Sequence, residues 1–306
     1  MLKVGAEHDA AVIEMGMRAK GEISYLSRMV KPDMAIITNI GTSHIETLGS
    51  KDEILKAKLE ITDGMKSGGV LMLCADDARL KAAKPRGVIP VLVGVENEKA
   101  DYRATNLRAD GFGMRFDFRT PDRVMRDMFI PAPSTPGVYA AAFAATCGIF
   151  SGMSEEEIKT GLLRFSQTGM RQKIRVAHGV TIIEDCYNAS PESVRASIDT
   201  LKYVNNSPRR TAVLGKMHEL GKYSIALHAD IGDYAAKNLD VLYVFGDSDD
   251  VLSMAREYKK SGREPIYLGS DVIAAEKILK NNIAPGDVLL FKASRAEKLE
   301  RLSEKL

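Results

Sequence analysis

Short apolar runs alternate with amphipathic stretches through the first hundred residues of the chain. The runs have the length of single buried strands, and they lie at Ala11–Glu14, Met34–Ile40, Val70–Cys74 and Val91–Val93. Between them, Gly21–Val30 and Lys51–Met65 carry the spacing of apolar residues that is typical of helices. Because strands alternate with helices, this part predicts a parallel sheet covered on both faces.

The pattern changes between residues 101 and 130. Three strand-like segments follow one another there, at Tyr102–Leu107, Gly113–Phe118 and Val124–Ile130. Asp110-Gly111 is a typical hairpin turn between the first two, so we expect a small antiparallel excursion. An Ala-rich buried helix is predicted next, over residues 137–150, and a capping box at residues 154–157 begins another helix that ends near residue 165.

A second alternating unit follows a polar stretch, Ser166–Gln172, that contains Gly169. This stretch is the predicted boundary between domains 1–168 and 169–306. The strands expected beyond it lie at Val180–Asp185, Thr211–Gly215, Val241–Phe245, Pro265–Leu268 and Val288–Phe291. The helices lie at Ser193–Val204, Ser224–Lys237, Val251–Lys259, Ile273–Lys280 and Ala296–Leu306. Two α/β domains in tandem are therefore the predicted architecture.

Composition narrows the function classes. Among 306 residues, 43 Lys and Arg nearly balance 41 Asp and Glu, which argues against a dedicated nucleic-acid binder. Three scattered cysteines do not make a disulfide framework or a Cys-rich zinc site. The longest apolar stretch, Val138–Ile149, is too short to cross a bilayer, and nothing at the start of the chain resembles a signal peptide. We expect a reduced, cytoplasmic protein without membrane insertion.

Polar residues at the ends of the expected strands are the first candidates for chemistry, because ligands bind at the carboxyl ends of strands in open parallel sheets. Glu14, Asn39, His44 and Asp185 occupy such positions. Glu14 and His44 together could hold a divalent cation, since carboxylate and imidazole are both competent ligands. The alternative is that the carboxylate caps a helix and the histidine is structural.

A phosphate-binding loop is suggested by Gly215–Tyr223, but the match fails. Five residues separate its glycines where a Walker loop has four, and Tyr223 stands where Ser or Thr must meet Mg²⁺. Neither G-x-x-x-x-G-K-[ST] nor G-x-G-x-x-G occurs in the chain. Motif counting alone therefore predicts no nucleotide site.

Two sets of short segments carry a resemblance to a known family. In the first half they are Val12–Gly16, Gly21–Ile23, Ile37–Glu46 and Ala57–Ile61. In the second half they are Thr168–Arg171, Asp185–Pro191, Ala212–Gly215, Glu219–Gly221 and Lys292–Arg295. In this order, and over essentially the whole chain, they resemble the Mur ligases, and within that family the MurF branch.

The resemblance implies a fold and a reaction. The fold would be a truncated Mur ligase central domain, mostly parallel with a small antiparallel excursion, followed by a Rossmann-like C-terminal domain. MurF ligases add D-alanyl-D-alanine to UDP-N-acetylmuramoyl-tripeptide in peptidoglycan precursor synthesis. They use ATP to phosphorylate the substrate carboxylate, and the amine then attacks the acyl phosphate. ATP and Mg²⁺ are the implied cofactors, and the tripeptide and the dipeptide are the implied partners.

The resemblance also assigns roles to individual residues. The implied Mg²⁺ site consists of Glu14, His44 and Lys58, the lysine being carbamylated and thus also catalytic. Further catalytic roles fall on Asp185 and Arg171. The residues implied to contact the nucleotide are Asn39, Asn188 and Tyr187, and those implied to bind the dipeptide are Lys292, Ser294 and Arg295. Simpler readings remain open for three of these residues: Lys58 as a solvated helix lysine, Asp185 as a helix cap and Tyr187 as a packing residue.

The chain departs from the family pattern at several places. No uridine-nucleotide domain and no Gly-Lys-Thr-Thr loop precede Glu14, so we expect this chain alone to be inactive. Ala293 replaces a glycine of the family, Lys216 an aspartate and Cys74 an asparagine, and Ser134–Ala140 replaces a stretch that lines the nucleotide site. Two alternatives follow: a non-catalytic Mur-like binding module, or a folylpolyglutamate or cyanophycin-type relative. The second is weaker, because the segments beginning at Asp185 and Lys292 are nearest to MurF.

Overall fold

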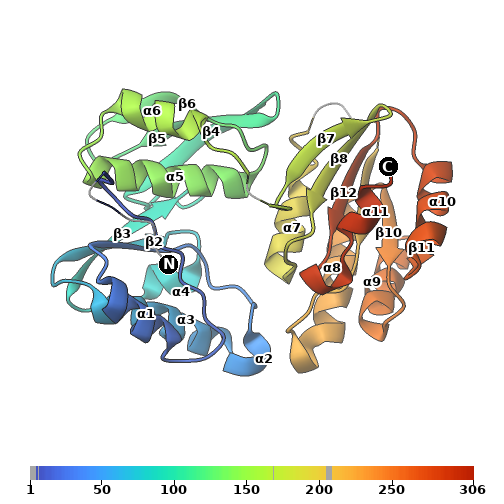
Figure 1. The fold of residues 1–306 in the computed structure, drawn as a ribbon, viewed down its shortest axis with the longest axis horizontal. Helices are drawn as coiled ribbons and strands as arrows, with labels where there is room; N and C mark the ends of the chain where they lie inside the picture. Colours follow the sequence, from blue (N-terminus) through green and yellow to red (C-terminus); the bar gives the residue numbers. More distant parts are fainter. Residues whose placement is uncertain (1–4, 6, 168, 205–208) are drawn as a thin grey trace.

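The two halves of the chain each form a sheet of six strands (Figure 1). The structure is a computed structural model, and it describes residues 5, 7–167, 169–204 and 209–306. The predicted fold class, two α/β units built mostly on parallel strands, is confirmed. The proposed boundary between residues 168 and 169 falls beside residue 168, which lies outside the described residues.

The first sheet has the strand order β1-β2-β3-β4-β5-β6. Its strands are β1 (Met34–Ile37), β2 (Gly69–Cys74), β3 (Val88–Gly94), β4 (Tyr102–Asp110), β5 (Gly113–Arg119) and β6 (Val124–Ile130). Pairing is parallel from β1 to β4 and antiparallel from β4 to β6. Gly111 makes the tight turn between β4 and β5 at a φ of 59°, which glycine adopts without steric cost. The expected antiparallel excursion is thus an extension of the same sheet.

Helices cover this sheet and close its core. They are α1 (Glu22–Val30), α2 (Ile45–Leu48), α3 (Lys51–Leu59), α4 (Ala78–Ala82), α5 (Thr135–Phe150) and α6 (Glu155–Leu163). In Figure 1, α5 and α6 lie along one face of β4, β5 and β6. The small side chains Ala141, Ala142 and Ala145 of α5 are buried, so the helix packs closely on the strands. Ser154 and Glu157 form the predicted capping box at the start of α6.

The second sheet has the order β11-β10-β9-β12-β8-β7. Its strands are β7 (Lys173–Ala177), β8 (Val180–Asp185), β9 (Arg210–Leu214), β10 (Val241–Phe245), β11 (Ile266–Gly269) and β12 (Val288–Lys292), of which only β7 is antiparallel to its neighbour. Its helices are α7 (Pro191–Thr200), α8 (Ser224–Asn238), α9 (Asp249–Lys259), α10 (Val272–Asn282) and α11 (Glu300–Ser303). One core lies between the sheet and α7, α8 and α9, and a second between the sheet and α10 and α11.

Three expectations about elements were wrong. Residues 11–14 form no strand, and Val12 is 98% exposed. The edge strand β1 pairs only with β2 among the described residues, so no neighbouring strand is present to bury this run. The helix expected over residues 296–306 is broken into a 3₁₀ turn (Arg295–Glu297) and α11, because Lys298 takes a left-handed φ of 50°. Strand β7, which carries the charged residues Lys173 and Arg175 and an exposed Val176, was not predicted.

None of the helices in the described part of the chain is both long enough and apolar enough to cross a membrane.

Candidate active site between the two halves

The loop that follows β1 is fixed by two other elements of the first half. The amide of Ile40 donates to Asp77 Oδ2 at 2.7 Å, and the other oxygen of Asp77 caps α4 by accepting from the amide of Arg79 at 2.9 Å. From α3, Lys58 Nζ donates to the carbonyl oxygen of Asn39 at 2.7 Å. Two predicted site residues, Asn39 and Lys58, are therefore in contact.

Lys58 differs from the other lysines of α3. Burial lowers the pKa of its ammonium, and the negative charges of Asp77 and Glu192 only partly oppose that effect. Lys56, two residues away, is exposed and pairs with Glu53 Oε1 at 2.7 Å, which raises its pKa. The reading of Lys58 as a solvated helix lysine does not fit this environment. An amine with a lowered pKa is more often neutral, and a neutral amine is nucleophilic.

Glu192 reaches from the second half into the loop after β1. It lies in the first turn of α7, and its Oε2 accepts from Thr42 Oγ1 at 2.9 Å and from the Thr42 amide at 3.3 Å. Its Oε1 accepts from Lys51 Nζ at 3.0 Å. Burial would raise the pKa of Glu192, but these contacts and a bond to its own amide outweigh burial and lower it. Glu192 is therefore a carboxylate that joins the two halves.

A second contact between the halves involves a predicted metal ligand. His44 Nδ1 lies 2.8 Å from Glu219 Oε2. Both residues have left-handed backbone, with φ values of 62° each, and His44 immediately precedes α2. Glu219 belongs to the loop between β9 and α8, which is the stretch that resembled a Walker loop. The imidazole of His44 thus faces the second half.

A buried histidine, His228, anchors the loop between β9 and α8. His228 Nε2 accepts from the amide of Met217 at 3.0 Å, and Nδ1 lies 2.8 Å from the carbonyl oxygen of Ser224. The acceptor role of Nε2 places the ring proton on Nδ1. Burial lowers the pKa of His228. A neutral imidazole therefore holds the loop that carries Glu219.

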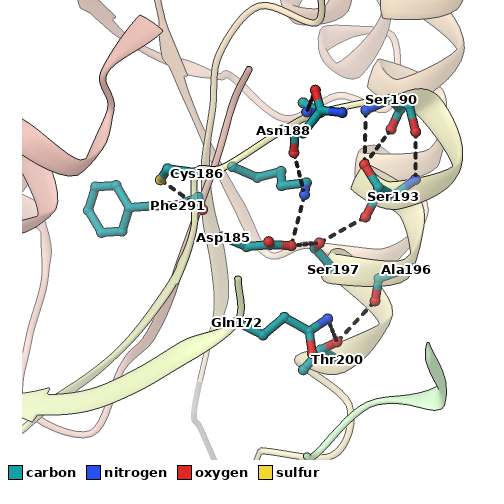
Figure 2. A network of polar contacts seen from close by, with 12 residues as sticks. Gln172, Asp185, Cys186, Asn188, Ser190, Ser193, Ala196, Ser197, Thr200 and Phe291 are labelled. Atoms are coloured by element: carbon teal, nitrogen blue, oxygen red, sulfur yellow. Dashed lines mark hydrogen bonds and ion pairs between the residues drawn. The ribbon is translucent and has the colours of Figure 1, made fainter. Parts of the chain in front are cut away.

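At the carboxyl ends of β8 and β12, a buried ion pair brings together three predicted residues (Figure 2). Lys292 Nζ lies 2.8 Å from Asp185 Oδ2 and donates to the carbonyl oxygen of Asn188 at 2.8 Å. Ser197 Oγ, on α7, donates to the same Asp185 oxygen at 2.5 Å. The cap of α7 is Ser190, so Asp185 does not act as its cap.

The remaining predicted residues lie around this network. The guanidinium carbon of Arg171 lies 4.2 Å from the centre of the exposed Tyr187 ring. Ser294 Oγ accepts from the amide of His218 at 2.9 Å, and Arg295 Nη1 lies 2.6 Å from Glu300 Oε1. The second half therefore gathers its predicted residues at one end of the sheet, as expected for strands that end side by side.

Glu14 is the predicted residue that the structure leaves apart. It is exposed, does not end a strand, and has no side-chain hydrogen bond or ion pair with any described residue. Within the described part of the chain, no three His, Cys, Asp or Glu side chains gather closely enough to hold a metal ion. A lysine is not among those ligand types, and Lys58 becomes an oxygen ligand only when it is carbamylated.

Sequence reasoning missed Glu192, Thr42 and Lys51. Thr42 lies inside Ile37–Glu46, one of the segments that carried the resemblance, so the sequence did indicate that it could lie beside the site. Nothing in the sequence indicated that Glu192 belongs to the site, because an acidic residue in the first turn of a helix is common for electrostatic reasons alone.

Comparison with known proteins decides the family. Residues 1–148 match the family model described as the Mur ligase middle domain, and residues 170–295 match the one described as the Mur ligase, glutamate ligase domain. The chain belongs to the Mur ligase family. Two of the segments that carried the resemblance, Ile37–Glu46 and Glu219–Gly221, lie where the two halves meet.

Three similar Mur ligases illustrate the relationship. The UDP-N-acetylmuramoyl-tripeptide–D-alanyl-D-alanine ligase of Bacillus subtilis is 34% identical over 97% of this chain and 64% of its own length. A MurF structure from Acinetobacter baumannii has a TM-score of 0.86 at 27% identity, covering 99% of this chain and 66% of that one. MurF from Thermotoga maritima in complex with ADP has a TM-score of 0.83 at 26% identity, covering 95% and 65%. The chain thus spans somewhat less than two thirds of the first of these relatives.

Proposed function

We propose that this chain supplies the middle and C-terminal domains of a cytoplasmic ligase of peptidoglycan precursor synthesis. The ligase would add D-alanyl-D-alanine to UDP-N-acetylmuramoyl-tripeptide with ATP. One observation carries the proposal: the segments that resemble MurF come from both halves and face each other, with Glu192 reaching the loop that also contacts Lys58. The names of the similar curated proteins support the choice of substrates.

The reaction needs two anions to meet. A carboxylate oxygen of the tripeptide attacks the γ-phosphorus of ATP and ADP leaves; the amine of the dipeptide then attacks the acyl carbon, and phosphate leaves with the bonding electrons. We place the nucleotide against Asn39, Asn188 and Tyr187, which lie at the facing strand ends. We place Arg171 near the transferred phosphoryl group, because its exposed guanidinium is held over the Tyr187 ring and a guanidinium suits phosphate oxygens.

We assign a Mg²⁺ site to Glu14, His44 and carbamylated Lys58. The fit rests on Lys58: burial favours its neutral amine, which is the form that reacts with carbon dioxide, and the product carbamate is an oxygen ligand of the kind Mg²⁺ prefers. When bound there, the ion would offset the repulsion between the two reacting anions. Without carbamylation, the described residues offer no complete set of ligands.

We assign the carboxylate of the dipeptide to the end of β12. Arg295 is the residue there that would receive it, because its guanidinium is largely exposed and has one carboxylate partner, Glu300. Lys292 is buried and already paired with Asp185. We therefore give Lys292, Asp185 and Ser294 the task of holding the turn on which Arg295 lies.

The test combines this chain with the part of the Bacillus subtilis ligase that it does not cover. The fusion is supplied with UDP-N-acetylmuramoyl-tripeptide, D-alanyl-D-alanine, ATP and Mg²⁺, and the pentapeptide product is measured by mass spectrometry. We expect product that depends on the dipeptide, lost in Lys58→Gln and kept in the matched surface variant Lys56→Gln. A folded fusion that binds ADP and the tripeptide but forms no pentapeptide would support the non-catalytic module instead.

A further inference from the structure

The outer face of β4, β5 and β6 holds a cavity far from the site between the halves. Met114, Phe116 and Phe118 of β5 are fully buried toward the core. Because side chains alternate along a strand, Asp117 and Arg119 point to the opposite face, away from α5 and α6. A cavity of about 490 Å³ lies on that face, and its lining includes Arg103, Thr105, Asn106, Asp117, Arg119 and Arg126.

Two of these arginines oppose each other directly. Arg103 of β4 and Arg119 of β5 are partners in the strand register, so like charges face each other across the strands, an arrangement that is destabilising. Arg103 is partly satisfied: its Nε donates to the carbonyl oxygen of Val95 at 3.0 Å, its Nη2 to that of Glu96 at 3.3 Å, and its Nη1 lies 4.0 Å from Glu98 Oε1. The side chains of Arg119 and Arg126 have no hydrogen bond or ion pair with any residue that the structure describes.

The carboxylate in the cavity does not neutralise these arginines by contact. Asp117 is 9% exposed, and its two oxygens accept from Asn106 Nδ2 at 2.8 Å and from the amide of Asp127 at 3.0 Å. These two contacts, together with the nearby positive charges of Arg126 and Arg108, lower its pKa. Asn106 and Asp127 have left-handed φ values of 55° and 56° and lie where the register shifts. Asp117 therefore maintains the shape of the cavity.

The other charges of this face are already paired. Asp127 Oδ1 lies 2.5 Å from Arg108 Nη2, and its Oδ2 lies 2.9 Å from Arg115 Nη1. Arg115 also contacts Asp110. On the far side of the opposed arginines, a smaller hollow of about 320 Å³ is lined by Glu98 and Asp101. Arg119 thus has no carboxylate partner among the described residues, and Arg126 is opposed only by the nearby charge of Asp117, without a hydrogen bond or ion pair.

We propose that this cavity binds a phosphoryl dianion between Arg103 and Arg119, with Arg126 at its edge. A bound dianion turns the repulsion of the opposed arginines into attraction, and planar guanidinium groups match phosphate oxygens with paired hydrogen bonds. The cavity exceeds the volume of inorganic phosphate, so the phosphoryl group is that of a small ester. The site is built from β4, β5, β6 and Val95, which follows β3, and it is independent of the ligase reaction.

Isothermal titration calorimetry of the 306-residue chain tests the proposal, with phenyl phosphate and inorganic phosphate as probes at low ionic strength. We expect both to bind, phenyl phosphate more tightly. Arg119→Gln should weaken binding at least tenfold, and the double variant Arg119→Gln/Arg126→Gln should abolish it. Arg164→Gln, another exposed arginine, and Arg171→Gln, at the site between the halves, should bind as the unaltered chain does.

Thermal unfolding supplies a second measurement. Without ligand, Arg119→Gln should unfold at a temperature equal to or higher than that of the unaltered chain, because a repulsion is removed. Phenyl phosphate should raise the unfolding temperature of the unaltered chain and of the two control variants, and leave that of the double variant unchanged. Any of four results would overturn the proposal. The double variant could bind with unchanged affinity, or Arg164→Gln could lose as much affinity as Arg119→Gln. Only Arg171→Gln could lose affinity, or the two probes could bind equally tightly.

Discussion

Lys58 is the residue whose chemistry most depends on its surroundings. Lys56 lies two residues away on the same helix. Burial lowers the pKa of Lys58, whereas an ion pair raises the pKa of Lys56. The sequence alone could name Lys58 through the family pattern, but it could not show this difference, because burial depends on how α3 meets the loop after β1.

We predict that Lys58 takes up carbon dioxide. In ¹³C-bicarbonate, the chain should give one carbamate resonance that is absent from Lys58→Arg and kept in Lys56→Arg. Because deprotonation exposes the reactive amine, the resonance should strengthen as the pH rises from about 6.5 to about 8.5. A resonance that survives in Lys58→Arg would refute the assignment.

Asp185 and Lys292 form the second residue-scale case, since each leaves a buried charge behind when the other is removed. We predict that Asp185→Asn and Lys292→Met each reduce the free energy of unfolding by about 3–5 kcal/mol. The double variant should lose clearly less than the sum. Urea unfolding measures all three variants. Lys237→Met, which breaks the exposed pair with Asp233, is the control and should change stability by less than about 1 kcal/mol.

At the scale of elements, apolar runs predicted strands well where the strands are central. Strands β8 and β10 have the predicted bounds, because a central strand is largely buried and carries a run of mostly apolar residues. Two failures have one physical cause. An apolar run becomes a strand only beside a partner, so residues 11–14 stay irregular; the half-exposed β7 pairs through its backbone although its side chains are partly charged.

The candidate site could be predicted only in part, because its contacts also depend on which elements are neighbours. Asp185 and Lys292 meet because β8 and β12 are neighbours in the sheet. The order of the strands in a sheet cannot be deduced from the hydrophobic pattern of either strand alone. The family resemblance supplied those residues, whereas the contacts of Glu192 depend on how the two halves meet.

The loop between β9 and α8 provides a prediction on pH. Since the pKa of His228 is lowered in the folded protein, unfolding takes up a proton once the pH falls below about 6.5, the pKa of an unfolded histidine. The stability from a neutral His228 is therefore complete above that pH and is lost as the pH falls toward its folded pKa.

Urea unfolding at about pH 7.5 and about pH 5.5 measures this effect for the unaltered chain and for His228→Asn. The variant should be less stable at the higher pH, and its stability should fall less between the two values. The exposed His178→Gln variant should follow the unaltered chain. An equal fall in all three proteins would contradict the role of His228.

At the scale of the whole molecule, the halves meet through half-exposed polar contacts and through Tyr203, which follows α7 and packs against the core of the first half. Glu192 contacts Thr42 and Lys51, and Glu219 contacts His44. Each such pair contributes about 1 kcal/mol or less, and salt screens it. The polar part of the contact between the halves is therefore weak and sensitive to salt.

We predict that Glu192→Gln combined with Glu219→Gln opens the molecule. Small-angle X-ray scattering should give a larger radius of gyration than for the unaltered chain at low salt, and concentrated salt should bring the two proteins to the same value. Glu156→Gln, an exposed residue of α6, is the control. If the radius of gyration is unchanged in the double variant, other contacts hold the halves.

The contact between Thr42 and Glu192 joins residues 150 positions apart, whereas the strands of each sheet all come from one half of the chain. Long-range contacts are slow to form, and separate units fold by themselves first. The two sheets can therefore fold as separate units, the first half before the second during synthesis, and the surface between them is completed last. A destabilising substitution in either half would then delay the appearance of the site even where the other half is already native.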